Sequence, residues 1–180
     1  MAIATTIEKY KSPPRTAMEV YEMLPEGTLA EVINNVLYMS PAPSFEHQDL
    51  LGDLFTDINI HVRNFESGKC VFSPVDVYLG DKNAIQPDIV FIAANNLGII
   101  RDGKIKGAPD LIIEVLSGNK KYDLQIKKSL YETFGVKEYF IIDPSDKSVV
   151  SYYYDGEKFI LQESKKGKIK SKLLKKVFAF

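Results

Sequence analysis

Two apolar, strand-like segments that contain acidic residues place the strongest constraint on how this chain can fold. The first, residues 85–92, carries Asp88, and the second, residues 108–117, carries Asp110 and Glu114. An isolated ionised carboxylate is costly among Ile, Val and Leu side chains, so such a group normally has a cation or a metal ion as its partner. Asp88 and Glu114 are therefore the first candidates for chemistry. Asp110 stands at the start of its segment, where we expect a turn or hydrogen-bonding role rather than metal binding.

A helix predicted over residues 122–134 follows the Glu114 segment directly and supplies a lysine. Asp123, Lys127 and Tyr131 are spaced four residues apart and share one helix face. Two carboxylates from neighbouring strands suit Mg²⁺ or Mn²⁺, and the sequence has no Cys/His pattern for zinc. Carboxylates, a divalent cation and Lys127 together suit phosphodiester hydrolysis, because the lysine can orient or deprotonate water or neutralise developing charge. Asp123 is expected to cap the helix and Tyr131 to pack beneath the site.

Three further residues each have two interpretations. Glu31 lies in an early strand and Asp76 alternates with two valines, so each is either an additional metal ligand or an ordinary strand residue. His47 falls in the first turn of a predicted helix, where it either caps and packs or contacts the active site.

The order of the predicted elements indicates an α+β fold, a sheet with helices packed on it, with an N-terminal helix and hairpin and a β-rich C-terminus. In chain order we first expect a helix over 17–24 capped by Thr16, a hairpin with strands 29–33 and 36–39 around Asn34-Asn35, and a helix over 45–65 capped by Ser44. A β-rich segment over 70–79, the two acidic segments and the 122–134 helix follow. The chain then continues with strands over 138–144, 149–154, 158–162 and 169–178. At this length, residues 1–180 are expected to form one domain with its own core.

Charge and hydropathy bear on location and partners. The chain has no run of about 18 apolar residues and no N-terminal basic segment followed by an apolar core, so we expect a cytoplasmic protein without membrane contact. Residues 165–180 hold seven lysines and no acid, which leaves 16 basic against 24 acidic residues in residues 1–164. This lysine-rich end either attracts a phosphate backbone or protects a strand edge from aggregation.

Taken together, the motifs resemble those of the Uma-two family of restriction-endonuclease-like proteins, in the PD-(D/E)XK nuclease superfamily, over nearly the whole chain. The segments that carry the resemblance are Pro43-Ser44-Phe45-Glu46-His47, Pro74-Val75-Asp76-Val77, Gln86-Pro87-Asp88-Ile89-Val90, Gly107-Ala108-Pro109-Asp110-Leu111-Ile112-Ile113-Glu114-Val115-Leu116-Ser117, Asp123 with Lys127 and Tyr131, Glu138-Tyr139 and Asp143-Pro144. The resemblance implies a restriction-endonuclease-like mixed β-sheet flanked by helices and a Mg²⁺-dependent nuclease site with DNA as substrate. It also implies that Asp88 and Glu114 are metal ligands, and that Glu31 is the extra acid that many such nucleases carry before the core.

The sequence departs from the superfamily pattern at one position. The residue two after Glu114 is a lysine in that pattern, and here it is Leu116. A lysine side chain reaches about 6 Å, so Lys127 of the next helix can place its ammonium in the same volume, whereas Lys128 points about 100° away around the helix.

Three hypotheses about function follow. The first is a Mg²⁺- or Mn²⁺-dependent endonuclease that hydrolyses DNA, with Asp88, Glu114 and Lys127 as its catalytic residues. The second is a catalytically weak or inactive nuclease-fold module that binds nucleic acid or a protein partner, because the Glu-x-Lys lysine is missing. The third is a structural or dimerisation unit, based on the Tyr152-Tyr153-Tyr154 run and the β-rich C-terminus, for which a homodimer is one candidate state.

Overall fold

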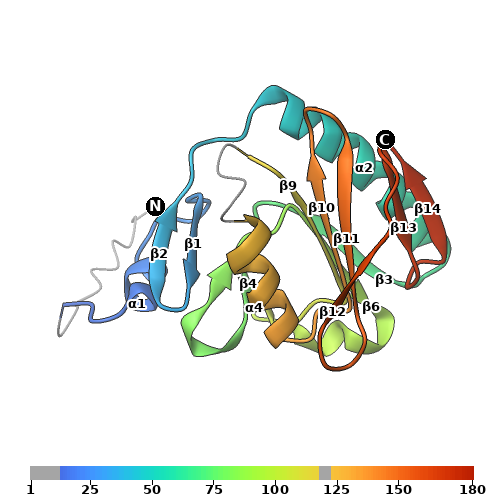
Figure 1. Cartoon of the computed structure of the whole chain (residues 1–180). Coiled ribbons are helices and arrows are strands. Elements are labelled where there is room, and N and C mark those ends of the chain that lie inside the picture. Colours follow the sequence, from blue (N-terminus) through green and yellow to red (C-terminus); the bar gives the residue numbers. More distant parts are fainter. Residues whose placement is uncertain (1–12, 118–122) are drawn as a thin grey trace, which may run out of the picture.

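The computed structural model describes residues 13–117 and 123–180, which form two six-stranded mixed sheets, a two-stranded ribbon and a small number of helices (Figure 1). The central sheet consists, in spatial order, of β12 (Phe159–Gln162), β11 (Ser148–Tyr154), β10 (Glu138–Asp143), β9 (Leu111–Val115), β6 (Ile89–Ala93) and β3 (Gly68–Phe72). The second sheet consists of β2 (Val36–Met39), β1 (Ala30–Ile33), β5 (Ala84–Ile85), β4 (Val77–Tyr78), β8 (Lys104–Lys106) and β7 (Ile100–Arg101). The ribbon is β13 (Lys168–Ser171) with β14 (Lys176–Ala179).

The helices are short except for one, and they flank the sheets. They are α1 (Ala17–Glu22), α2 (Phe45–Asn64) and α4 (Lys128–Thr133), with 3-10 turns η1 (Gly80–Lys82) and η2 (Ala94–Ile99) and the π-helical turn η3 (Asp123–Lys127). The predicted α+β class, with a mixed sheet flanked by helices, is confirmed. Within the described residues, no helix combines the length and the apolar character that crossing a membrane requires.

The local signals in the sequence mark the helix and hairpin boundaries. Thr16 caps α1 by accepting a hydrogen bond from the Glu19 amide, and Ser44 caps α2 in the same way. Asn34 and Asn35 both adopt positive φ, as a two-residue hairpin turn between β1 and β2 requires. The expected 122–134 helix is found as η3 and α4, while Tyr122 and the side chain of Asp123, with its predicted capping role, lie outside the described part of the chain.

The β-rich segment predicted over residues 70–79 contains parts of two strands. The β-rich residues 70–79 divide between the two sheets, because β3 ends at Phe72 on the edge of the central sheet and β4 starts at Val77 in the second sheet. Pro74 lies in the link, where its missing N–H removes no ladder hydrogen bond. The second sheet was not expected from the sequence.

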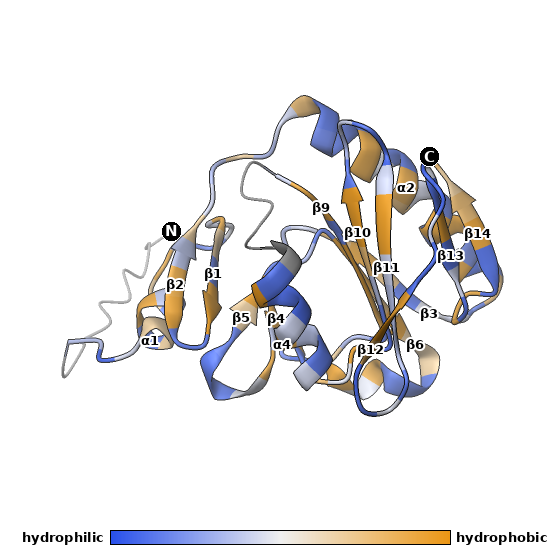
Figure 2. Cartoon of the chain, in the orientation of Figure 1, coloured by the Kyte–Doolittle hydropathy of each residue, from blue (hydrophilic) through white to orange (hydrophobic). Residues whose placement is uncertain are grey.

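The central sheet is apolar on both faces and lies between two hydrophobic layers (Figure 2). On one face, Ile113 and Val115 of β9 belong to the cluster that includes Leu54 and Ile58 of α2. On the other face, Ile112 belongs to a cluster formed with residues of the second sheet and α4. Because side chains alternate along a strand, Glu114 is on the same face as Ile112 and points between the two sheets.

Asp110 has the hydrogen-bonding role that its position predicts. Its buried carboxylate accepts hydrogen bonds from the Ala93 amide (2.8 Å), Asn96 Nδ2 (2.9 Å) and Lys137 Nζ (2.6 Å). Burial acts to raise the pKa of Asp110, but these donors outweigh it and hold the pKa below its usual value. Asp110 therefore secures the start of β9 and is occupied in doing so.

The C-terminal ribbon is attached to the central sheet through another buried acid. Glu138, at the start of β10, accepts hydrogen bonds from Ser171 Oγ (2.6 Å) and from the amides of Lys172 (2.7 Å) and Leu173 (2.9 Å). Burial raises the pKa of Glu138, although these donors and the Lys172 charge act in the opposite direction. The residues predicted as a strand over 169–178 therefore form a hairpin that is fixed at its turn.

The tyrosine run that suggested a dimer surface packs within the chain. Tyr153 is buried and its ring meets Phe140 edge-on, while Tyr152 stacks with Tyr139. Tyr154 lies edge-on to Phe159. These intramolecular contacts account for the aromatic residues without a second copy.

Candidate active site

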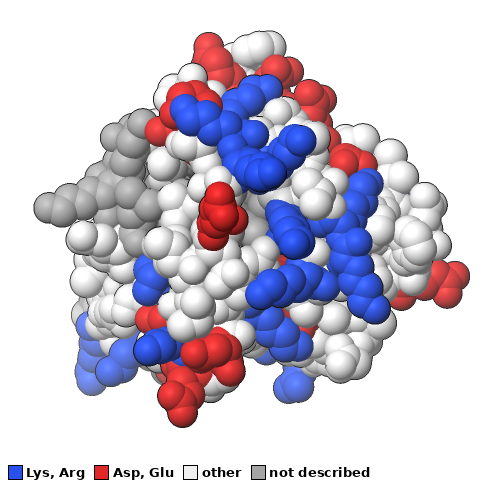
Figure 3. Space-filling model, turned by 45° about the vertical axis from the view of Figure 1, so that its right-hand side comes forward, with Lys and Arg blue, Asp and Glu red and all other residues white. Residues whose placement is uncertain are grey.

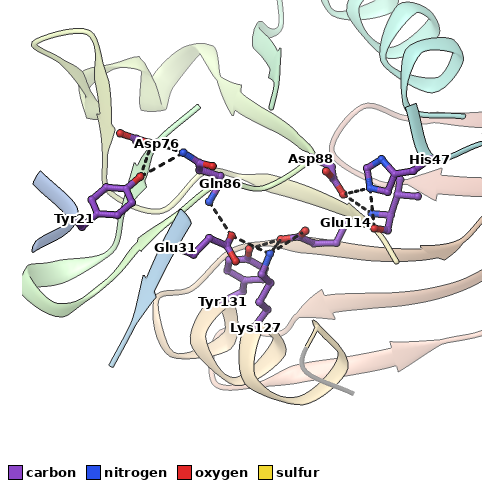
Figure 4. A network of polar contacts seen from close by, with 10 residues as sticks. Tyr21, Glu31, His47, Asp76, Gln86, Asp88, Glu114, Lys127 and Tyr131 are labelled. Carbon is purple, nitrogen blue, oxygen red and sulfur yellow. Dashed lines mark hydrogen bonds and ion pairs between the residues drawn. The ribbon is translucent and has the colours of Figure 1, made fainter. Parts of the chain in front are cut away.

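The candidate site lies where the two sheets meet, and separate parts of the chain build it. Glu31 comes from β1 of the second sheet, Asp88 from the link between β5 and β6, and Glu114 from β9 of the central sheet. Lys127, the last residue of η3, approaches from the helix that follows β9 (Figure 4). Residues far apart in the sequence thus meet at one point.

The strand register brings Asp88 and Glu114 together. In the antiparallel pair of β6 and β9, Ile89 lies opposite Ile113, so continuing the register by one residue sets Asp88 opposite Glu114. Asp88 Oδ2 accepts a hydrogen bond of 2.7 Å from the amide of Val115, the residue after Glu114. Side chains directly opposite each other in such a pair have their Cβ atoms about 5 Å apart. The two predicted acids are therefore neighbours.

Lys127 is buried between two carboxylates. Its ammonium lies 3.0 Å from Glu31 Oε1, 3.1 Å from Glu114 Oε1 and 3.2 Å from Glu114 Oε2, and the residue is only 5% exposed. A buried ammonium is stable only where opposite charge and hydrogen bonds compensate for its lost hydration. Two acids on one lysine supply both, and they hold the Lys127 ammonium in a fixed position.

Tyr131 completes the surroundings of Glu114. It lies one helical turn after Lys127, is fully buried, and donates a hydrogen bond of 2.6 Å from its hydroxyl to Glu114 Oε1. Burial, followed by the nearby Glu114 charge, raises the pKa of Tyr131 well above its usual value. The phenol therefore keeps its proton and acts as a donor, so it orients Glu114 as well as packing beneath the site.

His47 both packs and contacts the site. The amide of His47 donates to Ser44 Oγ at 3.3 Å in the first turn of α2. Its ring atom Nε2 lies 3.1 Å from the carbonyl oxygen of Val115 and 3.3 Å from Asp88 Oδ2. The structure thus places the ring of His47 on Asp88, while Ser44 fixes its backbone in the first turn of α2.

Asp76 and Glu31 occupy different positions in the polar network. Asp76 Oδ1 accepts hydrogen bonds from Tyr21 Oη (2.7 Å) and Gln86 Nε2 (3.0 Å), and Figure 4 shows it on the far side of Gln86 from Asp88. Glu31 Oε1 accepts a hydrogen bond of 2.9 Å from the Gln86 amide in addition to the Lys127 ion pair. Glu31 therefore joins the group around Lys127, whereas Asp76 belongs to the network that connects Gln86 to α1.

Two participants were missed in the sequence. Gln86 links the two halves of the network through its backbone and side chain, and the Val115 carbonyl contacts the same His47 nitrogen as Asp88 does. A backbone carbonyl has no sequence signal, but Gln86 stands two residues before Asp88 in a segment otherwise rich in apolar residues. A polar residue in that setting is the signal that could have identified it.

The donor set suits a divalent cation in its chemistry. The Asp88 carboxylate and the Val115 carbonyl are hard oxygen donors that converge on one atom of His47, and Glu114 is adjacent in the chain. Oxygen ligands of this kind are those that Mg²⁺ and Mn²⁺ accept. In the described parts of the chain, however, no three His, Cys, Asp or Glu side chains are already grouped as metal ligands. Binding of a cation therefore requires adjustment of Glu114, which is held by Lys127 and Tyr131.

The chain matches one family profile and one solved structure. Residues 17–173 match the family profile Uma2, described as "Putative restriction endonuclease". A solved structure from Anabaena variabilis ATCC 29413, described as "a putative nuclease belonging to DUF820", superposes with a TM-score of 0.72 at 19% sequence identity, covering 89% of this chain and 91% of that one. No curated protein matches the sequence significantly. The match in structure at this low identity establishes a shared fold.

Proposed function

Because this chain belongs to the Uma-two family of restriction-endonuclease-like proteins, whose profile matches residues 17–173, we propose that the site at the sheet junction hydrolyses phosphodiester bonds of DNA with the help of a divalent cation. The observation that supports this proposal most strongly is the buried ammonium of Lys127 between Glu31 and Glu114. It supplies the lysine that the sequence lacks two residues after Glu114.

The proposed roles follow from the contacts. Asp88, Glu114 and the Val115 carbonyl would hold Mg²⁺ or Mn²⁺, which when bound supplies Lewis-acid stabilisation to the reacting phosphoryl group and activates water. Lys127 contributes a fixed positive charge to the volume where negative charge develops on the phosphate. Glu31 holds that ammonium in place and Tyr131 orients Glu114.

The fixed position of Lys127 is what makes it useful in this mechanism. A lysine in solvent samples many rotamers, and its charge is strongly hydrated. Lys127 is 5% exposed and bonded to two acids, so its ammonium is already in place before charge appears on a phosphate oxygen, although Glu114 has to adjust when the cation binds. The leading hypothesis is therefore favoured over an inactive module.

The first test is metal-dependent nicking. Purified protein should convert supercoiled plasmid to the open-circular form in Mg²⁺ or Mn²⁺, as measured by agarose electrophoresis, and excess EDTA should abolish the conversion because the water then lacks its activating cation. Restoration of nicking after Mn²⁺ is added back distinguishes removal of the metal from loss of the protein. Salt-sensitive retention of DNA with no cleavage in any metal would support the binding module instead.

We expect the DNA backbone to lie on a basic surface to which the lysine-rich end contributes. Figure 3 shows Lys and Arg side chains gathered in a band across one face of the molecule. In β13 the alternation buries Ile169 and exposes Lys168 and Lys170, about 6.6 Å apart along the strand. Within the described residues, Lys166 pairs with Asp146 and Lys176 with Asp57, whereas no carboxylate lies within ion-pair distance of Lys165, Lys168, Lys170, Lys172 or Lys175.

Charge reversal in β13 should weaken DNA binding. We expect Lys168→Glu/Lys170→Glu to lower the affinity for duplex DNA and to reduce the slope of log K against log salt by about 0.9 for each phosphate that the protein no longer neutralises. Fluorescence anisotropy without divalent metal measures both quantities. The matched control is Lys104→Glu/Lys106→Glu in β8, which alters another Lys-Ile-Lys strand. Equal weakening by both pairs would indicate a general charge effect and not a binding surface in the ribbon.

A further inference from the structure

The outer face of the C-terminal ribbon combines two lysines with two apolar residues. Lys168 of β13 lies opposite Ala179 of β14. Two residues further along β13, Lys170 lies opposite Val177. Residues directly opposite in an antiparallel pair point to the same side. All four residues are exposed, and Val177 is 50% exposed. Attraction of phosphates accounts for the lysines, but it does not account for the apolar side chains beside them.

The inner face of the ribbon fixes it to the body of the protein. Ile169 and Phe178 are buried in the hydrophobic cluster that includes residues of α2. Tyr153 of β11 donates a hydrogen bond from its hydroxyl to the Lys170 carbonyl, and Glu138 of β10 holds the turn. The backbone of the ribbon is therefore ordered before a ligand binds, which lowers the entropy that binding costs.

The dimensions of the ribbon suit the major groove of duplex DNA. Neighbouring strands lie about 4.8 Å apart. The major groove is about 12 Å wide and admits a two-stranded β-ribbon, whereas the minor groove is about 6 Å wide. Lys168 and Lys170 are about 6.6 Å apart along β13, close to two base-pair steps of about 3.4 Å. A ribbon that lies along the major groove therefore presents its side chains to successive base pairs.

The chemistry of the outer face also suits this groove. Thymine presents its methyl group in the major groove, where apolar side chains such as alanine contact it. Val177 and Ala179 offer only hydrocarbon to a base. The two lysines carry positive charge for the phosphates that border the groove. Figure 3 shows Lys and Arg side chains gathered on the side of the molecule that holds the ribbon in Figure 1.

We propose that the ribbon of β13 and β14 enters the major groove of duplex DNA, where Val177 and Ala179 contact thymine methyl groups and the two lysines contact neighbouring phosphates. The ribbon thereby gives the protein a preference for sequences that contain thymine. This inference rests on the proposed function, because it assumes that duplex DNA is the substrate. The family profile ends at residue 173, in the turn of the ribbon, so β14 with both apolar residues lies outside the matched part of the chain.

The rival explanation is that the ribbon attracts the phosphate backbone and does not touch the bases. Replacing thymine by uracil separates the two roles, because it removes one methyl group from the major groove and leaves the phosphates and the base pairing unchanged. A contact with phosphates alone is insensitive to this change. A contact between Val177 or Ala179 and a thymine methyl group is lost.

The experiment begins with the selection of preferred sequences from a randomised duplex library by the full-length protein without divalent metal. Fluorescence anisotropy then compares the selected duplex with duplexes in which dU replaces dT at one position at a time. At one or two positions, dU should weaken binding by about fourfold, the effect of one methyl group that is no longer buried. Val177→Ser/Ala179→Ser should bind the dT and dU duplexes equally, with an affinity near that of the wild type for dU.

The matched control is Val36→Ser, because Val36 is 49% exposed in β2, at the edge of the second sheet, and so resembles Val177 in exposure. It should keep the full difference between the dT and dU duplexes. Circular dichroism checks that each variant is folded. If the double ribbon variant is unfolded, Val177→Ser and Ala179→Ser are compared singly in the same way.

The outcomes distinguish this inference from the proposed function. A library that yields no preferred sequence, equal binding of dT and dU duplexes at every position by the wild type, or a dU effect that persists in the folded ribbon variant overturns the base contact. Metal-dependent nicking of plasmid then still decides the nuclease proposal. A dU effect that only the ribbon variant loses, in a protein that nicks no DNA, supports the ribbon and counts against the nuclease.

Discussion

Replacing Glu114 by glutamine should lower the rate of metal-dependent plasmid nicking by about 1,000-fold or more. The substitution keeps the shape of the side chain and removes the charge that would hold the cation, and Lewis-acid stabilisation by such a cation is worth several kcal/mol, at about 1.4 kcal/mol per tenfold change in rate. Tyr131 still has an oxygen to donate to, and Lys127 keeps Glu31 as its partner. The loss should therefore appear in nicking rate and Mn²⁺ affinity much more than in stability.

The matched control for Glu114 is the buried acid of the adjacent strand. Glu138→Gln changes a glutamate that is 2% exposed in β10, but this residue holds the C-terminal hairpin and lies outside the candidate site. Its nicking rate, measured on folded protein under the same conditions, should stay within a few-fold of wild type. Equal nicking by wild type and Glu114→Gln would remove the proposed site.

Replacing Lys127 by methionine should lower nicking by about 100- to 1,000-fold, the effect of removing one preorganised charge from a site of this kind. It should also destabilise the fold by about 3–5 kcal/mol, because Glu31 and Glu114 are left buried without their shared cation. Chemical denaturation monitored by circular dichroism measures the second effect separately from the first. The destabilisation should become smaller when Mn²⁺ is added, because a cation can replace part of the missing charge.

Two further variants test whether the loss of nicking comes from Lys127 itself, and not from the loss of any lysine in this helix or from destabilisation of the fold. Lys128→Met removes the next lysine, which pairs with Glu132 at 3.5 Å on another face of the helix, and it should leave nicking unchanged. Glu31→Gln/Lys127→Met removes one negative and one positive charge, so the buried charge is better balanced and the protein should be more stable than the single variant while remaining inactive. Wild-type nicking in that folded double variant would show that Lys127 is not needed.

Local features of the fold were accessible from the sequence because each depends on neighbouring residues. Ser44 and Thr16 cap helices with their own hydroxyls, and Asn34-Asn35 supplies the positive φ values that its turn needs. The boundary of β3 was missed because the residues after Phe72 remain β-rich, and only their pairing partners reveal that the chain has changed sheets. Strand pairing between distant segments has no local signature.

Part of the candidate site could likewise be recognised from the sequence, and part of it only from the tertiary structure. The sequence by itself determined that Asp88 and Glu114 stand in apolar segments and that Lys127 and Tyr131 share a helix face, because both features can be recognised from the order of residues. The structure places Glu114 within β9 and Asp88 immediately before β6. Only the tertiary structure decided that Glu31 shares Lys127 with Glu114, and that His47 contacts both Asp88 and the Val115 carbonyl. The physical reason is that these contacts depend on sheet register and on the docking of α2 and η3, which arise from the packing of the whole core.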